Sequence, residues 1–327
     1  MEYMKIGHTD INASAITFGA MPIGGGTWWS GSDDKVSIDT VHPAYDLGIN
    51  TIDTAPIYGL GHSEEVVGKA IAGQRDKYVI STKATFDWDT GEGRFWHEVD
   101  GHKDIIKDCE NSLKRLGTDY IDIYYTHNPV RDPAWLEKYP VEDTVRALMD
   151  LKKAGKIRCI GSSNVDPEHI EAYMACGCEI DIIQRKYTIL ARGVEENILP
   201  ICEKYGMTFH AYAPIERGLL TGTVTKDRVV PPGDAREDQA WWAPDKLPHA
   251  IDFVDGLKDI CEEYHCTQTD LAIAFIRHNR PYVNVIYGAR KIKHLEAGAA
   301  TVNVTLRDDT VAEIRRRAEE LEAKYGG

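Results

Sequence analysis

Short apolar, β-branched runs alternate with longer amphipathic segments along almost the whole chain of 327 residues. The strand-like runs are residues 15–20, 50–55, 78–84, 120–127, 156–164, 179–187, 207–214 and 282–289. Helix-like segments occupy residues 34–47, 63–72, 102–116, 141–154, 167–176, 194–205, 248–264 and 267–279. This alternation predicts βαβ units and a parallel sheet. Eight such units without a break in composition favour a single α/β domain over residues 1–327, a closed (β/α)8 TIM barrel rather than an open doubly wound sheet.

The segments outside this repeat extend the barrel at both ends. The opening residues, MKIG-HTD-INASAI, predict an N-terminal β-hairpin that plugs the bottom of the barrel, and residues 307–323 predict a helix rich in Arg and Glu. Four connections are long, namely 20–33, 85–101, 128–140 and 215–247, and each follows a strand-like run. They should therefore lie on the C-terminal face, where barrel enzymes hold their active sites.

All the tryptophans fall within these four long loops, at Trp28, Trp29, Trp88, Trp96, Trp135, Trp241 and Trp242. Each one alone could simply fill space within its loop. Together on one rim they predict an aromatic pocket wall, because large apolar surface on a functional face usually marks a binding site.

Composition and charge exclude several classes of function. The formal charge of −14 argues against nucleic acid as a partner, since binding to its phosphates needs clustered Lys and Arg. No run approaches the roughly 18 apolar residues of a membrane span, and the first residues lack a signal-peptide core, so we expect a cytoplasmic protein without a membrane partner. Seven scattered cysteines without zinc-site spacing predict free thiols and no metal.

Polar residues stand at the C-terminal ends of three successive strand-like runs: Asp53, Lys83 and His127, with Tyr58 in the loop just beyond Asp53. His127 alone could be an ordinary core histidine and Asp53 alone a turn cap. A buried lysine, however, needs a nearby carboxylate, and neighbouring barrel strands would place Asp53 beside Lys83. We expect the Lys83 cation to lower the pKa of Tyr58, so that Tyr58 can exchange a proton near neutral pH.

The motifs around these residues resemble the aldo-keto reductase family. The segment GINTIDTAPIYGLGHSEEVVGKAI (48–71) resembles the family signature. The segments YVISTK (78–83), YIDIYYTHNP (120–129), IRCIGSSN (157–164), AYAPIERGLLTG (211–222) and VIYGARK (285–291) follow in the family's order. The chain looks most like the bacterial sugar, polyol and general-stress branch, which is related to potassium-channel β-subunits.

The resemblance implies a catalytic tetrad of Asp53, Tyr58, Lys83 and His127. Tyr58 would be the general acid in reduction and the base in oxidation, Lys83 paired with Asp53 would tune it, and His127 would orient the carbonyl. The implied enzyme is an NAD(P)-dependent oxidoreductase that interconverts a carbonyl (aldehyde, ketose or oxo-sugar) and an alcohol by hydride transfer.

The resemblance also implies a nicotinamide cofactor site. It assigns the carboxamide to Ser162, Asn164 and Gln184, ring stacking to Tyr212, the pyrophosphate to Pro214, Ile215, Gly218, Leu219 and Gly222, and the adenosine phosphate to Gly288, Ala289, Arg290 and His294. Small residues before a helix independently favour phosphate binding. The chain departs from many relatives at Ala297 and Gly298. The basic cluster of Arg290, Lys291 and Lys293 favours NADP(H), with NAD(H) as the alternative.

The substrate is less constrained by the sequence. Trp28, Trp29, Trp88, Trp96 and Asn128 are the candidate substrate contacts, and aromatic faces flanked by charges suit a small polar carbonyl or alcohol such as a sugar or polyol. Two other functions stay open. The chain could be a cofactor-sensing, non-catalytic subunit, or a Schiff-base lyase that uses Lys83. The sequence also leaves a homo-oligomer open.

Overall fold

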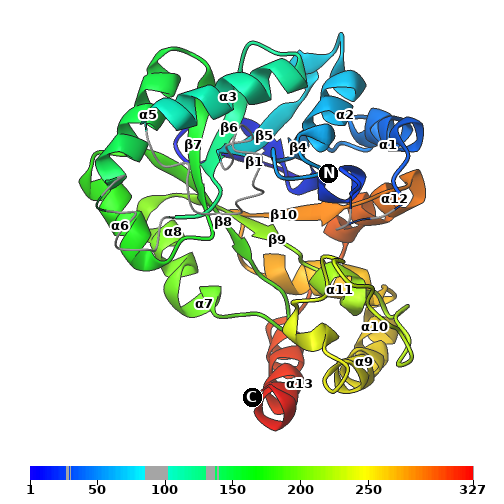
Figure 1. Cartoon of the computed structure of the whole chain (residues 1–327). Helices are drawn as coiled ribbons and strands as arrows, with labels where there is room; N and C mark the ends of the chain where they lie inside the picture. The colour runs from blue at the N-terminus through cyan, green and yellow to red at the C-terminus, as the bar shows by residue number, and fades with distance from the viewer. Residues whose placement is uncertain (27–28, 30, 85–101, 130–136, 138–139, 327) are drawn as a thin grey trace.

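The computed structural model describes residues 1–26, 29, 31–84, 102–129, 137 and 140–326 (Figure 1). Eight parallel strands form a closed barrel in the order β10-β3-β4-β5-β6-β7-β8-β9. Their bounds are β3 Ile16–Gly19, β4 Thr51–Asp53, β5 Val79–Ala84, β6 Ile121–Thr126, β7 Ile157–Ser163, β8 Ile180–Lys186, β9 Thr208–Tyr212 and β10 Val283–Gly288. The predicted TIM barrel is confirmed, and each predicted strand-like run contains one of these strands.

Helices surround the barrel, with bounds α1 Asp34–Val41, α2 His62–Ile71, α3 His102–Leu116, α5 Val141–Lys153, α6 Pro167–Ala175, α7 Val194–Asn197, α8 Leu199–Tyr205, α9 Leu247–Asp255, α10 Lys258–Tyr264, α11 Gln268–Arg277, α12 Ile292–Ala300 and α13 Asp308–Tyr325. Three predicted helices are broken. Pro43 ends α1 in a 3-10 turn, and Pro200 restarts the chain as α8, because proline cannot donate the intrahelical hydrogen bond. Gly256 separates α9 from α10.

The N-terminal hairpin pairs β1 (Tyr3–Lys5) with β2 (Asn12–Ser14), as predicted. Ile6 and Ile11 of its turn are buried in a cluster with Ile123 and Ile182 of the barrel strands. The hairpin therefore closes the N-terminal end of the barrel, so a ligand must enter from the opposite face.

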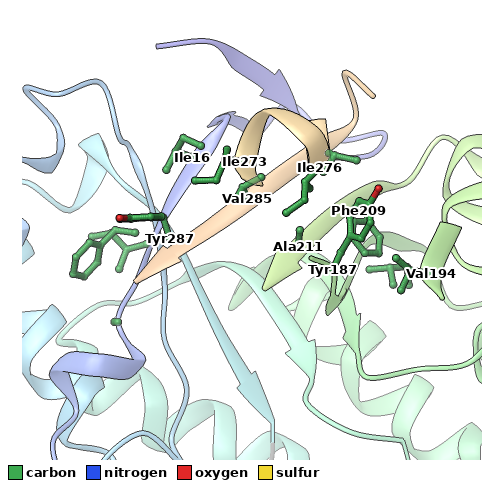
Figure 2. Close-up of a cluster of buried hydrophobic side chains, with 14 of the residues drawn as sticks. Ile16, Tyr187, Val194, Phe209, Ala211, Ile273, Ile276, Val285 and Tyr287 are labelled. Atoms are coloured by element: carbon green, nitrogen blue, oxygen red, sulfur yellow. The ribbon is translucent and has the colours of Figure 1, made fainter. Parts of the chain in front are cut away.

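The main core lies between the barrel and its helices. Figure 2 shows Ile273 and Ile276 of α11 lying over Val285 of β10, and all three side chains are fully buried. Burial of one such side chain stabilises the fold by about 1.5–3 kcal/mol. This layer holds the strands rigidly, so that residues at their C-terminal ends keep a fixed geometry. Within the described part of the chain, no helix is long and apolar enough to cross a membrane.

Candidate active site

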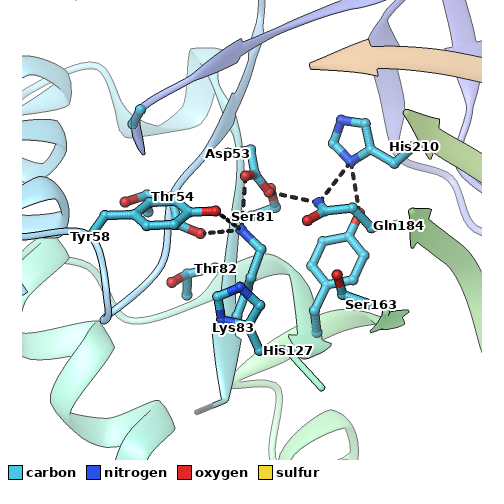
Figure 3. Close-up of polar contacts among 12 residues, drawn as sticks. Asp53, Thr54, Tyr58, Ser81, Thr82, Lys83, His127, Ser163, Gln184 and His210 are labelled. Atoms are coloured by element: carbon cyan, nitrogen blue, oxygen red, sulfur yellow. Dashed lines mark hydrogen bonds and ion pairs between the residues drawn. The ribbon is translucent and has the colours of Figure 1, made fainter. Parts of the chain in front are cut away.

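Three predicted catalytic residues meet around the Lys83 ammonium group (Figure 3). Lys83 Nζ donates to Asp53 Oδ1 at 2.8 Å, to the main-chain oxygen of Thr54 at 2.8 Å and to the Tyr58 hydroxyl at 3.3 Å. Asp53 is the last residue of β4, and Lys83 lies near the end of β5, which pairs with β4. The adjacency of the two strands thus produces the predicted ion pair.

The second oxygen of Asp53 is also fully engaged. Its Oδ2 accepts hydrogen bonds from Ser81 Oγ at 2.8 Å and from Gln184 Nε2 at 3.0 Å. Buried charges are tolerated when they are paired and hydrogen-bonded, and this carboxylate meets both conditions. The sequence analysis missed Ser81, although it stands two residues before Lys83 and therefore faces the same side of the strand.

Lys83 is held as a cation. Burial would lower the pKa of Lys83, but Asp53 and Tyr58 outweigh burial, and the pKa is raised. All three ammonium protons have acceptors. Lys83 therefore lacks the free lone pair that imine formation requires, which argues against the Schiff-base alternative.

Lys83 lowers the pKa of Tyr58, as expected, but the net shift of this pKa is upward, so the expected proton exchange near neutral pH is not supported. Burial raises the pKa of Tyr58, and the lowering effect of the Lys83 cation does not cancel it. A phenolate in a low-dielectric site loses more hydration than one nearby cation restores. Tyr58 is therefore a phenol at neutral pH, the form that can donate a proton.

His127 lies directly after β6 and is buried. Burial and the Lys83 cation hold the pKa of His127 well below its usual range, so the imidazole is neutral. Its ring meets the Tyr58 ring edge-on, with centroids 6.2 Å apart. A neutral imidazole can donate one hydrogen bond without adding charge, which suits contact with a carbonyl oxygen.

The loop that carries Tyr58 is fixed by a close contact between backbones. Gly59 has φ of 61°, and a Cβ added there would overlap the Gly24 carbonyl oxygen. A Cβ on Gly24 would in turn lie 2.8 Å from the Tyr58 carbonyl carbon. The backbone at Gly24 therefore contributes to the placement of Tyr58.

The predicted carboxamide group needs one correction. The hydroxyl of Ser162 bonds Thr126 Oγ1 at 2.7 Å, away from Gln184. Ser163 is the register partner of Gln184 across β7 and β8, and its Oγ accepts from Asn164 Nδ2 at 3.2 Å. The structure thus places Ser163, and not Ser162, with the other predicted residues, because successive strand residues face opposite sides.

Asn164 and Tyr212 contact each other at the end of the barrel. The Tyr212 hydroxyl donates to Asn164 Oδ1 at 2.8 Å, and Asn164 Nδ2 donates to the main-chain oxygen of His127 at 2.8 Å. Asn164 has a left-handed backbone with φ of 56°. These contacts link three of the predicted site residues across β6, β7 and β9.

The predicted pyrophosphate loop follows β9 as the 3-10 element η4, Glu216–Thr221. Pro214 and Leu219 are buried, Ile215 is half-buried, and Gly218 and Gly222 adopt positive φ values of 102° and 71°. Glu216 is fully buried and accepts from Lys186 Nζ at 2.5 Å and from Thr188 Oγ1 at 2.9 Å. This buried carboxylate fixes the loop to β8.

Arg217 supplies an observation that fits an anionic ligand. Its Nε is buried without a hydrogen-bond partner among the described residues, and its Nη1 donates to Ala235 O at 2.5 Å. Burial lowers the pKa of Arg217, with Tyr212 and Glu216 acting in the opposite direction. A buried guanidinium N–H without a partner is costly, and a phosphate oxygen would satisfy it. The residues present therefore fit a dinucleotide.

The predicted adenosine end lies where β10 meets α12. Gly288 and Arg290 are exposed, Ala289 is buried, and His294 is largely exposed. Burial lowers the pKa of His294, and Lys293, Lys291 and Arg290 lower it further. These neighbours gather positive charge at the start of α12, as the sequence predicts for a phosphate site.

The described candidate substrate residues are Trp29 and Asn128. Trp29 lies between two arginines, with ring-to-Cζ distances of 5.2 Å to Arg236 in the long loop after β9 and 5.8 Å to Arg290 just before α12. Trp29 Nε1 and Asn128 Nδ2 are buried, and neither has a partner in the described part of the chain. Each could donate to a bound ligand.

The other tryptophans do not bear out a common aromatic rim. Trp28, Trp88, Trp96 and Trp135 lie outside the described residues. Trp241 and Trp242 are buried in the main core, and Trp242 Nε1 donates to Glu216 O at 3.0 Å. These two side chains hold the long loop in place instead of lining a pocket wall.

Comparison of the sequence with known proteins points to the same family as the geometry of the site. The model of the Aldo/keto reductase family matches residues 15–319. The chain belongs to this family. It is 38% identical over 333 residues to an NADH-specific methylglyoxal reductase of Escherichia coli, covering 98% of this chain and all of that protein. It is 37% identical to the aldo-keto reductase YhdN of Bacillus subtilis, covering 96% and 92%.

Solved structures agree with this membership. The glycerol dehydrogenase AKR11B4 from Gluconobacter oxydans superposes with a TM-score of 0.84 at 30% identity, covering 99% of this chain and 95% of that one. The holo form of the aldo-keto reductase AKR11C1 from Bacillus halodurans gives a TM-score of 0.75 at 27% identity, with 98% and 96% coverage. The chain is an NAD(P)-dependent aldo-keto reductase.

Proposed function

We propose that this enzyme reduces small polar carbonyl compounds, with Tyr58 as the general acid. The observation that carries the proposal is the Lys83 ammonium group, which joins Asp53, Thr54 O and the Tyr58 hydroxyl in a buried site. The bound nicotinamide cofactor supplies the hydride. Every other requirement of the reaction, a proton and a site for developing charge, falls to side chains of the chain itself.

Each member of the tetrad has a distinct role in this proposal. Tyr58 donates its phenolic proton to the substrate oxygen as the alcohol forms. Lys83, 3.3 Å from the hydroxyl, stabilises the charge left on Tyr58, and Asp53 keeps Lys83 protonated. Neutral His127 donates to the carbonyl oxygen and orients it. In oxidation Tyr58 accepts the proton instead.

The proposed cofactor site runs from the barrel centre to α12. Gln184, Asn164 and Ser163 would hold the carboxamide, Tyr212 would stack on the nicotinamide ring, and the Pro214–Gly222 loop with Arg217 would hold the diphosphate. We propose NADP(H) over NAD(H), because Arg290, Lys291 and Lys293 concentrate positive charge where a further phosphate would lie. Among the relatives, the Escherichia coli reductase is named NADH-specific and one from Schizosaccharomyces pombe is named for NADP(+), so membership alone does not select the cofactor.

We propose a small oxygen-rich substrate: a sugar, an oxo-sugar, a polyol or a short aldehyde. The relatives named for methylglyoxal and glycerol act on molecules of this kind. The buried N–H groups of Trp29 and Asn128 offer donors for carbonyl or hydroxyl oxygens. An extended apolar substrate would leave these donors without partners, which costs about 1–3 kcal/mol for each group.

The test follows reduced-nicotinamide absorbance with NADPH and NADH against methylglyoxal, glyceraldehyde, ketoses and oxo-sugars. Wild-type turnover should fall about a hundred- to ten-thousandfold in Tyr58→Phe, the range of a general-acid contribution, while cofactor binding is unchanged. Retained turnover would refute the role of Tyr58. Tight cofactor binding without turnover on any substrate would instead favour a cofactor-sensing subunit.

A further inference from the structure

A pair of buried polar side chains lies in the barrel interior next to Gln184. Tyr125 comes from β6 and His210 from β9, and both are almost completely buried. The Tyr125 hydroxyl and His210 Nδ1 are 2.9 Å apart, and Gln184 Nε2 lies 3.4 Å from the same ring nitrogen. Figure 3 shows His210 and Gln184 beside Asp53. The tetrad does not include this pair, so its presence needs a separate explanation.

The barrel is shaped to hold the Tyr125 ring. Gly161 is the register neighbour of Tyr125 on β7, and a Cβ at Gly161 would overlap the ring. Tyr125 also packs in the apolar cluster that contains Ile123 and Ile182. Packing therefore fixes the position of the ring, and the Tyr125 hydroxyl is held next to His210 Nδ1.

Counting donors and acceptors fixes the state of His210. Gln184 Nε2 carries only donors, so the ring nitrogen that faces it, Nδ1, must be an acceptor. Tyr125 then donates its single proton to the same Nδ1. Burial lowers the pKa of His210 to about 4, so the ring is neutral at physiological pH, with its proton on Nε2, which is buried without a hydrogen-bond partner among the described residues.

The same count of donors and acceptors fixes the orientation of the Gln184 side-chain amide. Its two N–H groups face two acceptors, Asp53 Oδ2 at 3.0 Å and His210 Nδ1 at 3.4 Å. The reversed amide would direct Oε1 against the Asp53 carboxylate, which is repulsive. Oε1 is thereby left as the acceptor that Gln184 offers to a ligand.

We propose that Tyr125 and His210 are positioning residues that orient Gln184 for the cofactor. By holding His210 in one tautomer, Tyr125 keeps an acceptor facing the Gln184 N–H. Gln184 Oε1 then accepts from the carboxamide NH2 of the nicotinamide. This inference rests on the proposed function, because it assigns the ligand of Gln184 to the cofactor site described above.

The test compares two ligands that differ only at the group Gln184 would contact. In 3-acetylpyridine analogues a methyl group replaces the carboxamide NH2. We expect wild-type protein to bind NADPH or NADH about three- to tenfold more tightly than the matching reduced analogue, the value of one neutral hydrogen bond. In Tyr125→Phe the ratio of the two affinities should fall toward one. A merely structural defect would weaken both ligands equally and leave their ratio unchanged.

The control is Tyr124→Phe, the same substitution one position away. Tyr124 is equally buried, and its hydroxyl has no partner among the described residues, so the ligand preference should match wild type. A second pair of variants covers a failure of Tyr125→Phe to fold. His210→Asn keeps an acceptor near the Nδ1 position and should preserve the preference, whereas His210→Leu should lose it. An unchanged preference in folded Tyr125→Phe or His210→Leu overturns the proposal.

A second readout requires no cofactor. Nitrogen-15 NMR of labelled histidine distinguishes the two ring nitrogens, and the His210 signals are those missing from His210→Leu. We expect a pyridine-type Nδ1 in the wild-type protein and a mixture of tautomers in Tyr125→Phe. A protonated Nδ1 in wild type would refute the positioning pair. Failure of wild type to bind either cofactor would refute the proposed function and leave this result standing.

Discussion

Replacement of Asp53 by Asn should destabilise the fold strongly. The Lys83 ammonium group is fully buried, and Asp53 Oδ1 is its anionic partner at 2.8 Å. Removal of one member of a buried ion pair leaves an uncompensated charge and costs about 3–5 kcal/mol. Ser81 Oγ and Gln184 Nε2 would also lose the charged acceptor that they share. We therefore expect the free energy of unfolding at pH 7 to fall by at least about 3 kcal/mol.

The pH dependence of that loss has a definite sign. In the wild type the pKa of Lys83 is raised above its unfolded value, so this contribution to stability is complete below pH 10.5, and it is lost only as pH rises through the folded pKa. In Asp53→Asn burial still lowers the pKa of Lys83, but the carboxylate that mainly raises this pKa is gone. The folded pKa should then lie below the unfolded one, and stability should rise as pH increases toward 10.

Urea unfolding at pH 7.0, 8.5 and 9.5 measures both effects. Ser81→Ala is the control, because it removes one neutral donor to the charged Asp53 and should cost about 1.5–3 kcal/mol without a pH trend of its own. A loss below about 1 kcal/mol in Asp53→Asn would contradict the reasoning. So would a variant whose stability stays level between pH 7.0 and 9.5, as the Lys83 contribution does in the wild type.

Three shorter predictions concern proton donation, loop geometry and cofactor choice. Because the pKa of Tyr58 is raised, the rate of carbonyl reduction should stay level through neutral pH and decline only above about pH 10, and a decline centred below pH 8 would contradict the phenol assignment. Gly59→Ala should lower the free energy of unfolding by more than about 2 kcal/mol, measured by thermal or urea unfolding. The new Cβ would overlap Gly24 O, and alanine would also be strained at this positive φ. Gly73→Ala, with φ of 76° and open space, should show the strain alone, about 1 kcal/mol. Arg290→Ala should reduce kcat/KM for NADPH about tenfold or more and leave that for NADH nearly unchanged; equal losses would refute a phosphate contact.

The barrel could be predicted because its cause is local. Eight apolar runs separated by helix-like segments specify parallel strands, and the ends of adjacent strands must then meet. Asp53 and Lys83 therefore come together whatever the detailed packing. Pairings of this kind depend only on strand order, which the sequence contains.

The choice between Ser162 and Ser163 could not be predicted in the same way. The residues are identical neighbours, and a shift of one position moves a side chain from one face of a strand to the other. The pairing of β7 with β8 is irregular between Ile160 and Gly161, so alternation counted along β7 does not reveal which serine lies beside Gln184. Register between strands decides this, and register is a property of the assembled barrel.

The pKa of Tyr58 shows a different limit. The sequence supplies the cation that lowers this pKa, but it does not supply the depth of burial that raises it. Burial is set by the assembled site, where the Gly24 and Gly59 backbones lie close together beside Tyr58, and no residue pattern predicted that contact. The sign of a shift in a buried site follows from the balance of desolvation and charge, so both must be known.

A series of buried hydrogen bonds connects Lys83 through Asp53, Gln184 and His210 to Tyr125. Stability alone does not readily explain this series. A buried hydrogen bond adds only about 1 kcal/mol net, whereas each unsatisfied member costs about 1–3 kcal/mol. Apolar residues in place of Tyr125 and His210 would fill the barrel at no such risk, and replacement of a buried polar pair by apolar groups of similar shape is often neutral or stabilising. Apolar residues, however, cannot fix the orientation of the Gln184 amide, because they do not distinguish its NH2 group from its oxygen. Asp53 Oδ2 and His210 Nδ1 both accept from Nε2 and so favour the same orientation of the amide, and that orientation matters only if a ligand contacts the remaining oxygen.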